Sequence, residues 1–298
     1  MKGFVTIATG NIKYYKIAAN LLMSYRYFSK EPYPFAIIAD KENEYTKLFD
    51  KVIILTNPHR SYLDKIELLS NAPFDENIFI DADCLAYKDL NQYWGYFENC
   101  TDFSAFGGTL SLDQKGDFYD HEGTGVFKDK ISYLTHLHGG LYYIRKSEAC
   151  KQLLLTCRYI IDHYSEFTFK MFQNAPADET VLALAMSVNG MKSVKAPPGG
   201  MCFYPCNTYF SSDISQGRLE FSMPWFPKNT IVDNGYCVHW GNFNIDKPVY
   251  QLEVYRLNKM SRTERISPLM IKIKKSCLSL SYAWRRLLNR LKRILQHN

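Results

Sequence analysis

The sequence predicts an α/β protein with a Rossmann-like, mostly parallel central sheet flanked by helices. Over the first 80 residues, strand-like apolar runs alternate with helical patterns, as they do in doubly wound sheets. Residues 35–39 (FAIIA) are apolar throughout, which is typical of a strand buried on both faces of a parallel sheet. Polar groups follow three of the expected strands, and ligands of such sheets bind beyond the carboxyl ends of the strands.

The spacing of apolar residues defines the elements of the first half. A strand is expected at 4–8 and a helix at 14–28, with Thr9-Gly10-Asn11 as the turn between them. The following elements are a strand at 35–39, a short helix at 45–49, a strand at 52–55, a helix at 63–70 and a strand at 77–80.

The second half is less regular. The pattern predicts helices at 90–97, 147–164 and 181–188, and strands at 103–106, 141–144 and 236–240. Residues 107–130 are polar and contain Gly and Asp, which favours either a mobile acceptor loop or an insertion. Irregular or short-stranded structure is expected for residues 194–200 and for the aromatic residues Phe203, Tyr204, Trp225 and Phe226.

The composition is that of a globular protein, but its charge is unevenly distributed. With 298 residues, 46% hydrophobic and 22% charged, the chain can form one large or two smaller domains. Residues 256–298 contain 12 Lys or Arg and one acid, so this segment carries +11 and residues 1–255 carry −5 of the overall +6. We therefore expect a folded domain at 1–255 and a basic tail at 256–298 that contacts a polyanionic surface, either nucleic acid or anionic lipid.

The cysteines and the apolar segments favour the cytoplasm. The eight cysteines form no C-x-x-C pair and no zinc-site spacing, which indicates reduced thiols. The start, MKGFVTIATGN, has too short an apolar run for a signal peptide. No segment reaches the 18 or more uncharged apolar residues of a membrane span.

Asp81-Ala82-Asp83 directly follows the strand expected at 77–80. In an extended chain residues i and i+2 point to the same side, so the carboxylates of Asp81 and Asp83 converge. Two like charges held so close favour a hard divalent cation bound through oxygen, either Mg²⁺ or Mn²⁺. The alternative is a solvated acidic turn.

Two histidines are candidate ligand-binding residues. His239 ends the apolar strand at 236–240 and is a candidate third metal ligand, because Mn²⁺ accepts an imidazole among oxygens; a hydrogen-bonded core histidine is the alternative. His136 and His138, two residues apart, could bind a metal, but Gly139-Gly140 beside them favour a backbone brought close to a ligand, so we expect His138 to contact substrate.

A nucleotide fits the crevice beyond the first strands. Thr9 and Asn11 are available to its base or ribose, although a tight turn explains Gly10-Asn11 equally well. Lys65, on the helix before the Asp81 strand, is a candidate phosphate ligand, with a solvated helix lysine as the alternative. Neither a G-x-G-x-x-G nor a Walker A motif is present, which argues against dinucleotide and P-loop chemistry.

Asp178-Glu179 opens the helix expected at 181–188. Acids at a helix start usually cap the helix and complement its dipole, and Asp178 is expected at the N-cap. The same position also presents carboxylates to a sugar hydroxyl.

The ordered set of motifs resembles the GT-A glycosyltransferases, most closely the family 8 type of glycogenin and of bacterial lipopolysaccharide galactosyl- and glucosyltransferases. The resemblance spans about residues 3–250. It is carried by TIATGN, Asp81-Ala82-Asp83 with Lys88-Asp89-Leu90, Gly-Gly-Leu-Tyr-Tyr-Ile, Ala-Asp-Glu, and a late Val-His-Trp-Gly followed by Lys-Pro.

The resemblance implies a transferase that moves a hexose from a UDP-sugar to a saccharide or lipid-linked acceptor, with retention of the anomeric configuration. By this resemblance, Asp81, Asp83 and His239 hold Mn²⁺ or Mg²⁺ on the diphosphate. The other implied roles are uridine contacts for Thr9 and Asn11, phosphate or sugar contacts for Lys65 and Lys247, and donor-sugar contacts for Asp178 and Glu179. If the enzyme inverted instead, Asp178 or Glu179 would be the general base.

The chain departs from the family pattern at three places. Asp178-Glu179 stands where the family has Asp-Gln, and His138-Gly139-Gly140 stands for its Asn-Ala-Gly. The segment from His239 to Lys247-Pro248 is longer than in the family. These departures bear on the donor sugar and on the role of Lys247.

From residue 271 the tail has the pattern of an amphipathic helix. One side has Leu280, Trp284, Leu287, Leu288, Leu291 and Leu295, and the other has Arg285, Arg286, Asn289, Lys292 and Arg293. This pattern is typical of a helix lying on an anionic membrane surface, here through residues 278–296, and it would place the enzyme on the inner face of the cell membrane. The alternative is a helix packed on its own domain with a solvated basic face.

Two other functions compete. A D-x-D phosphohydrolase would use Asp81 as nucleophile and Asp83 as acid, but that chemistry favours Thr or Gly after the second Asp, where this chain has Cys84. A nucleic-acid-binding module would act through the tail, but such modules spread basic groups over a folded face, and residues 1–255 are net acidic. We therefore expect no nucleic-acid partner.

Overall fold

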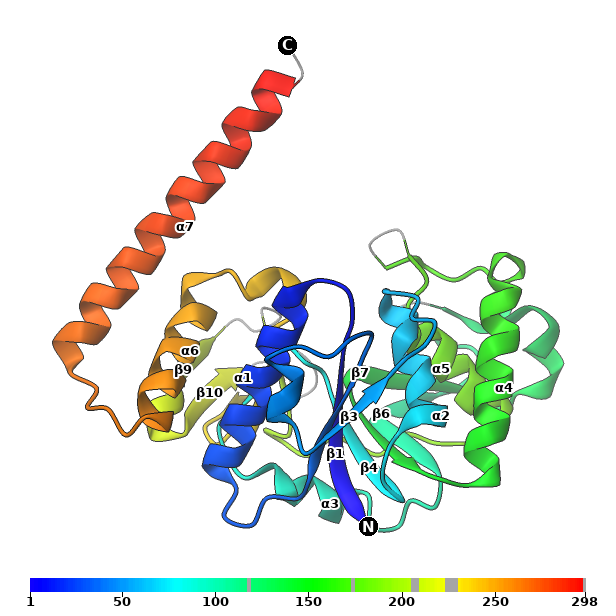
Figure 1. The fold of residues 1–298 in the computed structure, drawn as a ribbon. Helices are drawn as coiled ribbons and strands as arrows, with labels where there is room; N and C mark the ends of the chain where they lie inside the picture. The colour runs from blue at the N-terminus through cyan, green and yellow to red at the C-terminus, as the bar shows by residue number, and fades with distance from the viewer. Residues whose placement is uncertain (117–118, 173–174, 205–208, 223–229, 297–298) are drawn as a thin grey trace. The chain divides into compact units, whose positions relative to one another are not determined.

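The computed structural model describes residues 1–116, 119–172, 175–204, 209–222 and 230–296 (Figure 1). The chain forms two compact units. The first comprises residues 1–22, 31–82 and 91–197, and the second comprises residues 23–30, 83–90 and 198–298. The predicted boundary between residues 255 and 256 stays a prediction.

The first unit contains a sheet of six strands in the order β3-β2-β1-β4-β7-β6. The strands are β1 (Lys2–Ala8), β2 (Phe35–Ala39), β3 (Lys51–Ile54), β4 (Glu76–Ile80), β6 (Phe103–Leu110) and β7 (Leu134–Arg145). β1 to β4 pair in parallel, whereas β7 is antiparallel to both β4 and β6. The predicted α/β class with a mostly parallel sheet is confirmed.

Helical segments alternate with these strands, as predicted for the first 80 residues. They are α1 (Ile12–Phe28), which continues into the second unit, η1 (Thr46–Leu48), η2 (Tyr62–Glu67), α2 (Leu68–Asn71), η3 (Leu90–Gln92), α3 (Tyr93–Tyr96), η4 (His121–Lys130), α4 (Glu148–Asp162), η5 (Tyr164–Glu166) and α5 (Asp178–Val188). α4 begins after Ser147, whose hydroxyl accepts the Cys150 N–H and so caps the helix.

Burial explains why the strands of this sheet are so apolar. All five residues of β2 are buried, and so are the last six of β1. Leu153, Cys157 and Ile160 of α4 are buried at helical spacing. The core therefore lies between the sheet and the helices that cover it.

The expectation that residues 107–130 form a mobile acceptor loop or an insertion is wrong for residues 107–110, because β6 continues to Leu110, and part of the remaining segment is helical in η4. β7 is likewise longer than predicted and includes His138-Gly139-Gly140. Glycines have low strand propensity, so the pattern ended both strands too early. Cross-strand pairing overrides it: Gly107 pairs with Leu137 and Gly108 with His136, after a β-bulge at Ala105/Gly107.

The second unit contains two small sheets and two helices. One sheet has the order β5-β12-β8 and the other β11-β10-β9. The elements are β5 (Cys84–Ala86), β8 (Cys202–Phe203), β9 (Phe210–Asp213), η6 (Ile214–Gln216), β10 (Arg218–Ser222), β11 (Ile231–Val232), β12 (Cys237–His239), η7 (Asn242–Asn244), α6 (Pro248–Ser261) and α7 (Pro268–Gln296). The ring of Tyr204 packs against that of Trp240, with 5.0 Å between the ring centres. Trp225 and Phe226 lie outside the described residues.

The predicted C-terminal helix is present as α7, which is 29 residues long. Its large apolar side chains are exposed, among them Leu280 (72%) and Trp284 (62%). Within the described part of the chain, no helix combines the length and apolar character needed to cross a bilayer.

Candidate functional site

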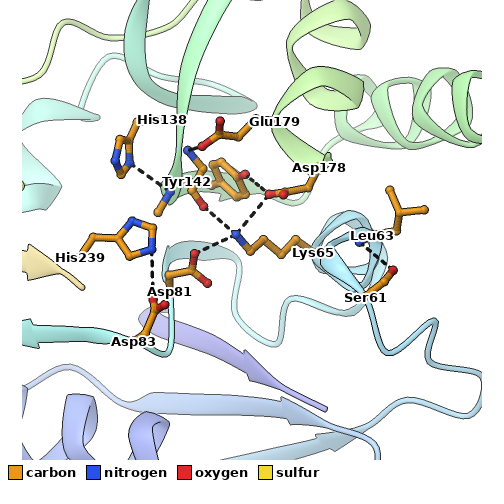
Figure 2. A network of polar contacts seen from close by, with 12 residues as sticks. Ser61, Leu63, Lys65, Asp81, Asp83, His138, Tyr142, Asp178, Glu179 and His239 are labelled. Atoms are coloured by element: carbon orange, nitrogen blue, oxygen red, sulfur yellow. Dashed lines mark hydrogen bonds and ion pairs between the residues drawn. The ribbon is translucent and has the colours of Figure 1, made fainter. Parts of the chain in front are cut away.

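The centre of the candidate site in the first unit is Lys65 of η2 (Figure 2). Its ammonium donates to a carboxylate oxygen of Asp81 at 2.8 Å and to the carbonyl of Gly139 at 3.1 Å. Asp178 lies 3.2 Å from the same nitrogen. The side chain of Lys65 is only 12% exposed, so this lysine is not the solvated helix residue of the alternative interpretation.

The charge of Lys65 is stabilised by its neighbours. Burial by itself lowers the pKa of a lysine, but the negative charges of Asp178 and Asp81 more than reverse this effect and hold the pKa of Lys65 above its ordinary value. Lys65 is therefore a fixed positive charge beside Asp81, at the end of β4.

Asp178 is the first residue of α5, and the prediction that it is the N-cap is wrong, because Ala177 is the N-cap and makes no side-chain capping bond. The Asp178 carboxylate is used elsewhere. It accepts a hydrogen bond from the Tyr142 hydroxyl at 2.8 Å and pairs with Lys65. Burial and the nearby Asp178 raise the pKa of Tyr142 well above its ordinary value, so the phenol stays a donor.

Glu179 turns toward β7, where its Oε1 accepts the Gly139 N–H at 2.5 Å. Gly139 thus contacts Glu179 through its N–H and Lys65 through its carbonyl. Next to it, the Gly140 N–H donates to Nδ1 of His138 at 3.1 Å, and the Gly140 carbonyl accepts the Asp81 N–H at 3.0 Å. The structure therefore brings Lys65, Asp81, His138, Asp178 and Glu179 together within the first unit.

In the second unit, Asp83 and His239 form a close pair. Nε2 of His239 lies 3.1 Å from Oδ1 of Asp83, and both side chains are 11% exposed. Strand pairing explains the contact, because His239 of β12 is opposite Cys84 of β5, and the Trp240 N–H donates to the Asp83 carbonyl at 3.1 Å. A carboxylate and an imidazole that meet in this way offer one oxygen and one nitrogen ligand.

The turn after β1 is held by two aspartates. The Thr9 hydroxyl donates to buried Asp64 at 2.6 Å, and the Gly10 N–H donates to Asp40 at 3.2 Å. Asn11 accepts the Lys13 N–H through its side chain and is exposed. The φ of Gly10 is +78°, a conformation that favours glycine. Thr9 and Asn11 therefore form an ordered turn, and their predicted uridine contacts stay a prediction.

Lys247 lies in the second unit at the start of α6, where it is the N-cap. Its ammonium is 5.4 Å from the centre of the Tyr204 ring. This cation–π contact gives the lysine a structural role, and its predicted phosphate or sugar contact stays a prediction.

Two residues of this arrangement were not predicted from the sequence. Asp64 supports Thr9 and also accepts the His59 N–H at 2.6 Å. Tyr142 supports Asp178. Because side chains alternate along a strand, the sequence could have indicated that Tyr142 lies on the same face as Gly140. Only the pairing of β7 with its neighbours shows which face this is.

No protein-family model and no curated protein matches the chain. Several solved structures are similar to it. The galactosyltransferase LgtC, solved with donor and acceptor sugar analogues, is 12% identical with a TM-score of 0.49, over 92% of this chain and 100% of LgtC. An active-site mutant of LgtC has the same identity and coverage, with a TM-score of 0.50. The bifunctional glycosyltransferase WbbM is 11% identical with a TM-score of 0.51, over 91% of this chain and 51% of WbbM.

At 11% to 12% sequence identity, the similarity to these structures supports a shared fold alone. The LgtC mutant and WbbM share the chain's architecture over most of its length, so the GT-A type of fold predicted from the sequence motifs is confirmed.

Proposed function

We propose that this protein is a metal-dependent glycosyltransferase that moves a hexose from a UDP-sugar to a hydroxyl of a saccharide or lipid-linked acceptor, with retention. The observation that carries the proposal is the Asp81-Ala82-Asp83 segment at the end of β4, with Lys65 on its first carboxylate and His239 on its second. The glycosyltransferase fold supports it.

The proposed metal ligands are Asp81, Asp83 and His239, which offer carboxylate oxygens and an imidazole nitrogen. One residue separates the two aspartates, so both carboxylates belong to a single short segment. Lys65 contacts Oδ2 of Asp81, and a carboxylate has a second oxygen for a cation. Two carboxylates and an imidazole suit Mn²⁺, with Mg²⁺ as the other candidate. When bound, the cation would stabilise negative charge on the departing diphosphate.

The remaining site residues have proposed roles around the donor. Thr9 and Asn11 line the uridine, Lys65 and Lys247 lie near phosphate or sugar, and His138 contacts the substrate. Asp178 and Glu179 contact the donor sugar. Breaking the anomeric C–O bond develops positive charge on the sugar, which fixed carboxylates stabilise. In this proposal retention needs no enzyme nucleophile, because the acceptor hydroxyl attacks the anomeric carbon from the face that the diphosphate leaves, and its proton passes to the departing diphosphate.

The tail has a proposed role in locating the enzyme. The exposed apolar side chains of α7, including Trp284 and Leu288, alternate with basic residues along the helix. We propose that residues 278–296 lie on an anionic membrane surface, and that residues 1–255 act as the catalytic domain on the cytoplasmic side. A lipid-linked or lipopolysaccharide acceptor would be presented there.

The test is hydrolysis of a panel of UDP-hexoses by the purified protein in Mn²⁺. We expect UDP release from one donor, lost in EDTA and in Asp83→Asn, because the amide keeps the shape of the side chain but removes its charge. Asp113→Asn is the matched control, because it makes the same change at an exposed aspartate that is not a proposed site residue, and it should retain activity. No UDP release from any donor, together with no UDP binding in Mn²⁺, would contradict the proposal.

A further inference from the structure

We propose that Gly139 is a positioning residue for Glu179, and that the contact between the two sets the selection of the donor sugar. The inference rests on the proposed function, because it concerns the same sugar site. Gly139 lies in β7, and Glu179 lies in the first turn of α5. Figure 2 shows Glu179 directed toward the β7 backbone.

Gly139 fixes the direction of Glu179 through one short hydrogen bond. Its N–H donates to Oε1 of Glu179 at 2.5 Å, and its carbonyl accepts from Lys65 at 3.1 Å. Lys65 is itself anchored by Asp81 and Asp178. The backbone of Gly139 therefore joins Glu179 to the rest of the charged cluster.

The absence of a side chain at Gly139 makes this contact available. A Cβ placed on Gly139 would lie 2.5 Å from Oε1, 2.6 Å from Cγ and 2.9 Å from Cδ of Glu179. Nonbonded atoms do not approach so closely. The atoms in the way belong to the end of a flexible side chain, so a Cβ would displace Glu179 and leave the strand in place.

The chemistry of Glu179 makes its direction important. An ionised carboxylate only accepts hydrogen bonds, and the Gly139 N–H already occupies Oε1. A carboxylate has lone pairs for several donors, so the carboxylate held in this direction can also accept from a hydroxyl of the sugar. Hexoses that differ in the direction of one hydroxyl differ in whether they reach it, and a site built to bind a hydroxyl discriminates strongly when that bond is lost.

The experiment compares Gly139→Ala with Gly108→Ala. Gly108, in the adjacent strand β6, has open space where its Cβ would lie, so it carries the same chemical change without a collision. We expect Gly139→Ala to lower kcat/KM for the preferred donor about tenfold or more, since small misplacements of positioning groups have effects of this size. The ratio of kcat/KM for UDP-galactose to that for UDP-glucose should also change, whereas Gly108→Ala leaves both quantities at the wild-type value.

The same substitution in a Glu179→Ala background isolates the contact. When the Glu179 side chain is truncated to alanine, a Cβ at position 139 no longer collides with it. Gly139→Ala should then lower kcat/KM by less than about a further twofold. The affinity for the donor, measured by titration with the UDP-hexose and Mn²⁺, compares the same single and double variants without requiring turnover. Circular dichroism and the midpoint of thermal unfolding should be unchanged in Gly139→Ala.

Two results would overturn the inference: kinetics of Gly139→Ala equal to those of Gly108→Ala, or an undiminished loss in the Glu179→Ala background. Both outcomes are distinct from failure of the proposed function, in which the wild-type protein releases no UDP from any donor.

Discussion

At the residue scale, one lysine organises the acidic side chains of the first unit. Lys65 contacts Asp81, Asp178 and the Gly139 carbonyl, and it is almost completely buried. A buried ammonium is stable only when carboxylates neutralise it, so these residues depend on one another. Two of the three departures from the family pattern, at Gly139 and Glu179, meet in a single contact beside it.

Lys65→Met is predicted to lower the free energy of unfolding by about 3 kcal/mol at pH 7, because it leaves two carboxylates buried without their cation. The pKa of Lys65 is raised in the folded protein, so its stabilisation is complete below the ordinary lysine pKa of 10.5 and is lost only as the pH rises through the higher folded-state value. Urea unfolding between pH 7 and pH 10 should therefore give a constant difference between wild type and variant.

Lys151→Met is the control, because Lys151 pairs with Glu148 on the exposed surface of α4. We expect no measurable change in stability there. A Lys65→Met protein as stable as wild type would show that the buried cluster does not need its cation.

At the element scale, the pairing of β6 with β7 extends both strands through their glycines. Neither Gly107-Gly108 nor Gly139-Gly140 favours a strand by propensity, yet both lie in strands. The pairing of Gly107 with Leu137 brings the two backbones close together after the bulge at Ala105/Gly107. A Cβ on Gly107 would collide with the carbonyl group of His136 and with Cα of Leu137.

Gly107→Ala is accordingly predicted to destabilise the protein by about 2 kcal/mol or more, because the obstructing atoms are backbone and cannot turn aside. Thermal unfolding of Gly107→Ala and Gly108→Ala measures the difference. Gly108→Ala should unfold near the wild-type midpoint, since its Cβ meets open space. Equal midpoints for the two variants would mean that the strands separate at the bulge without cost.

At the scale of the whole molecule, charge is segregated along the chain. Residues 256–298 carry +11 and residues 1–255 carry −5. In α7 the basic residues accompany exposed leucines and Trp284, so the helix offers both electrostatic and apolar attraction to a lipid surface. Binding to nucleic acid would use only the electrostatic attraction of the basic residues.

Deletion of residues 271–298 is predicted to abolish binding to phosphatidylserine-containing vesicles while turnover of the soluble donor continues. Vesicle sedimentation and UDP release measure the two properties. For the full chain, binding should weaken as salt is raised and should be weak on neutral vesicles, because much of the attraction is electrostatic. Loss of nucleic-acid binding on deletion, with no effect on vesicles, would favour the competing function.

The sequence by itself determined the first four strands, their alternation with helices, and so the position of the two aspartates after β4. The reason is that burial on one face of an element leaves a periodic apolar pattern, and burial on both faces of a strand leaves a continuous apolar run. Only the tertiary structure decided that Lys65 joins Asp81 to Asp178, that Asp178 bonds Tyr142 and does not cap α5, and that Gly139 holds Glu179. These contacts link residues far apart in the chain. They depend on the order and register of the strands, which local periodicity does not specify.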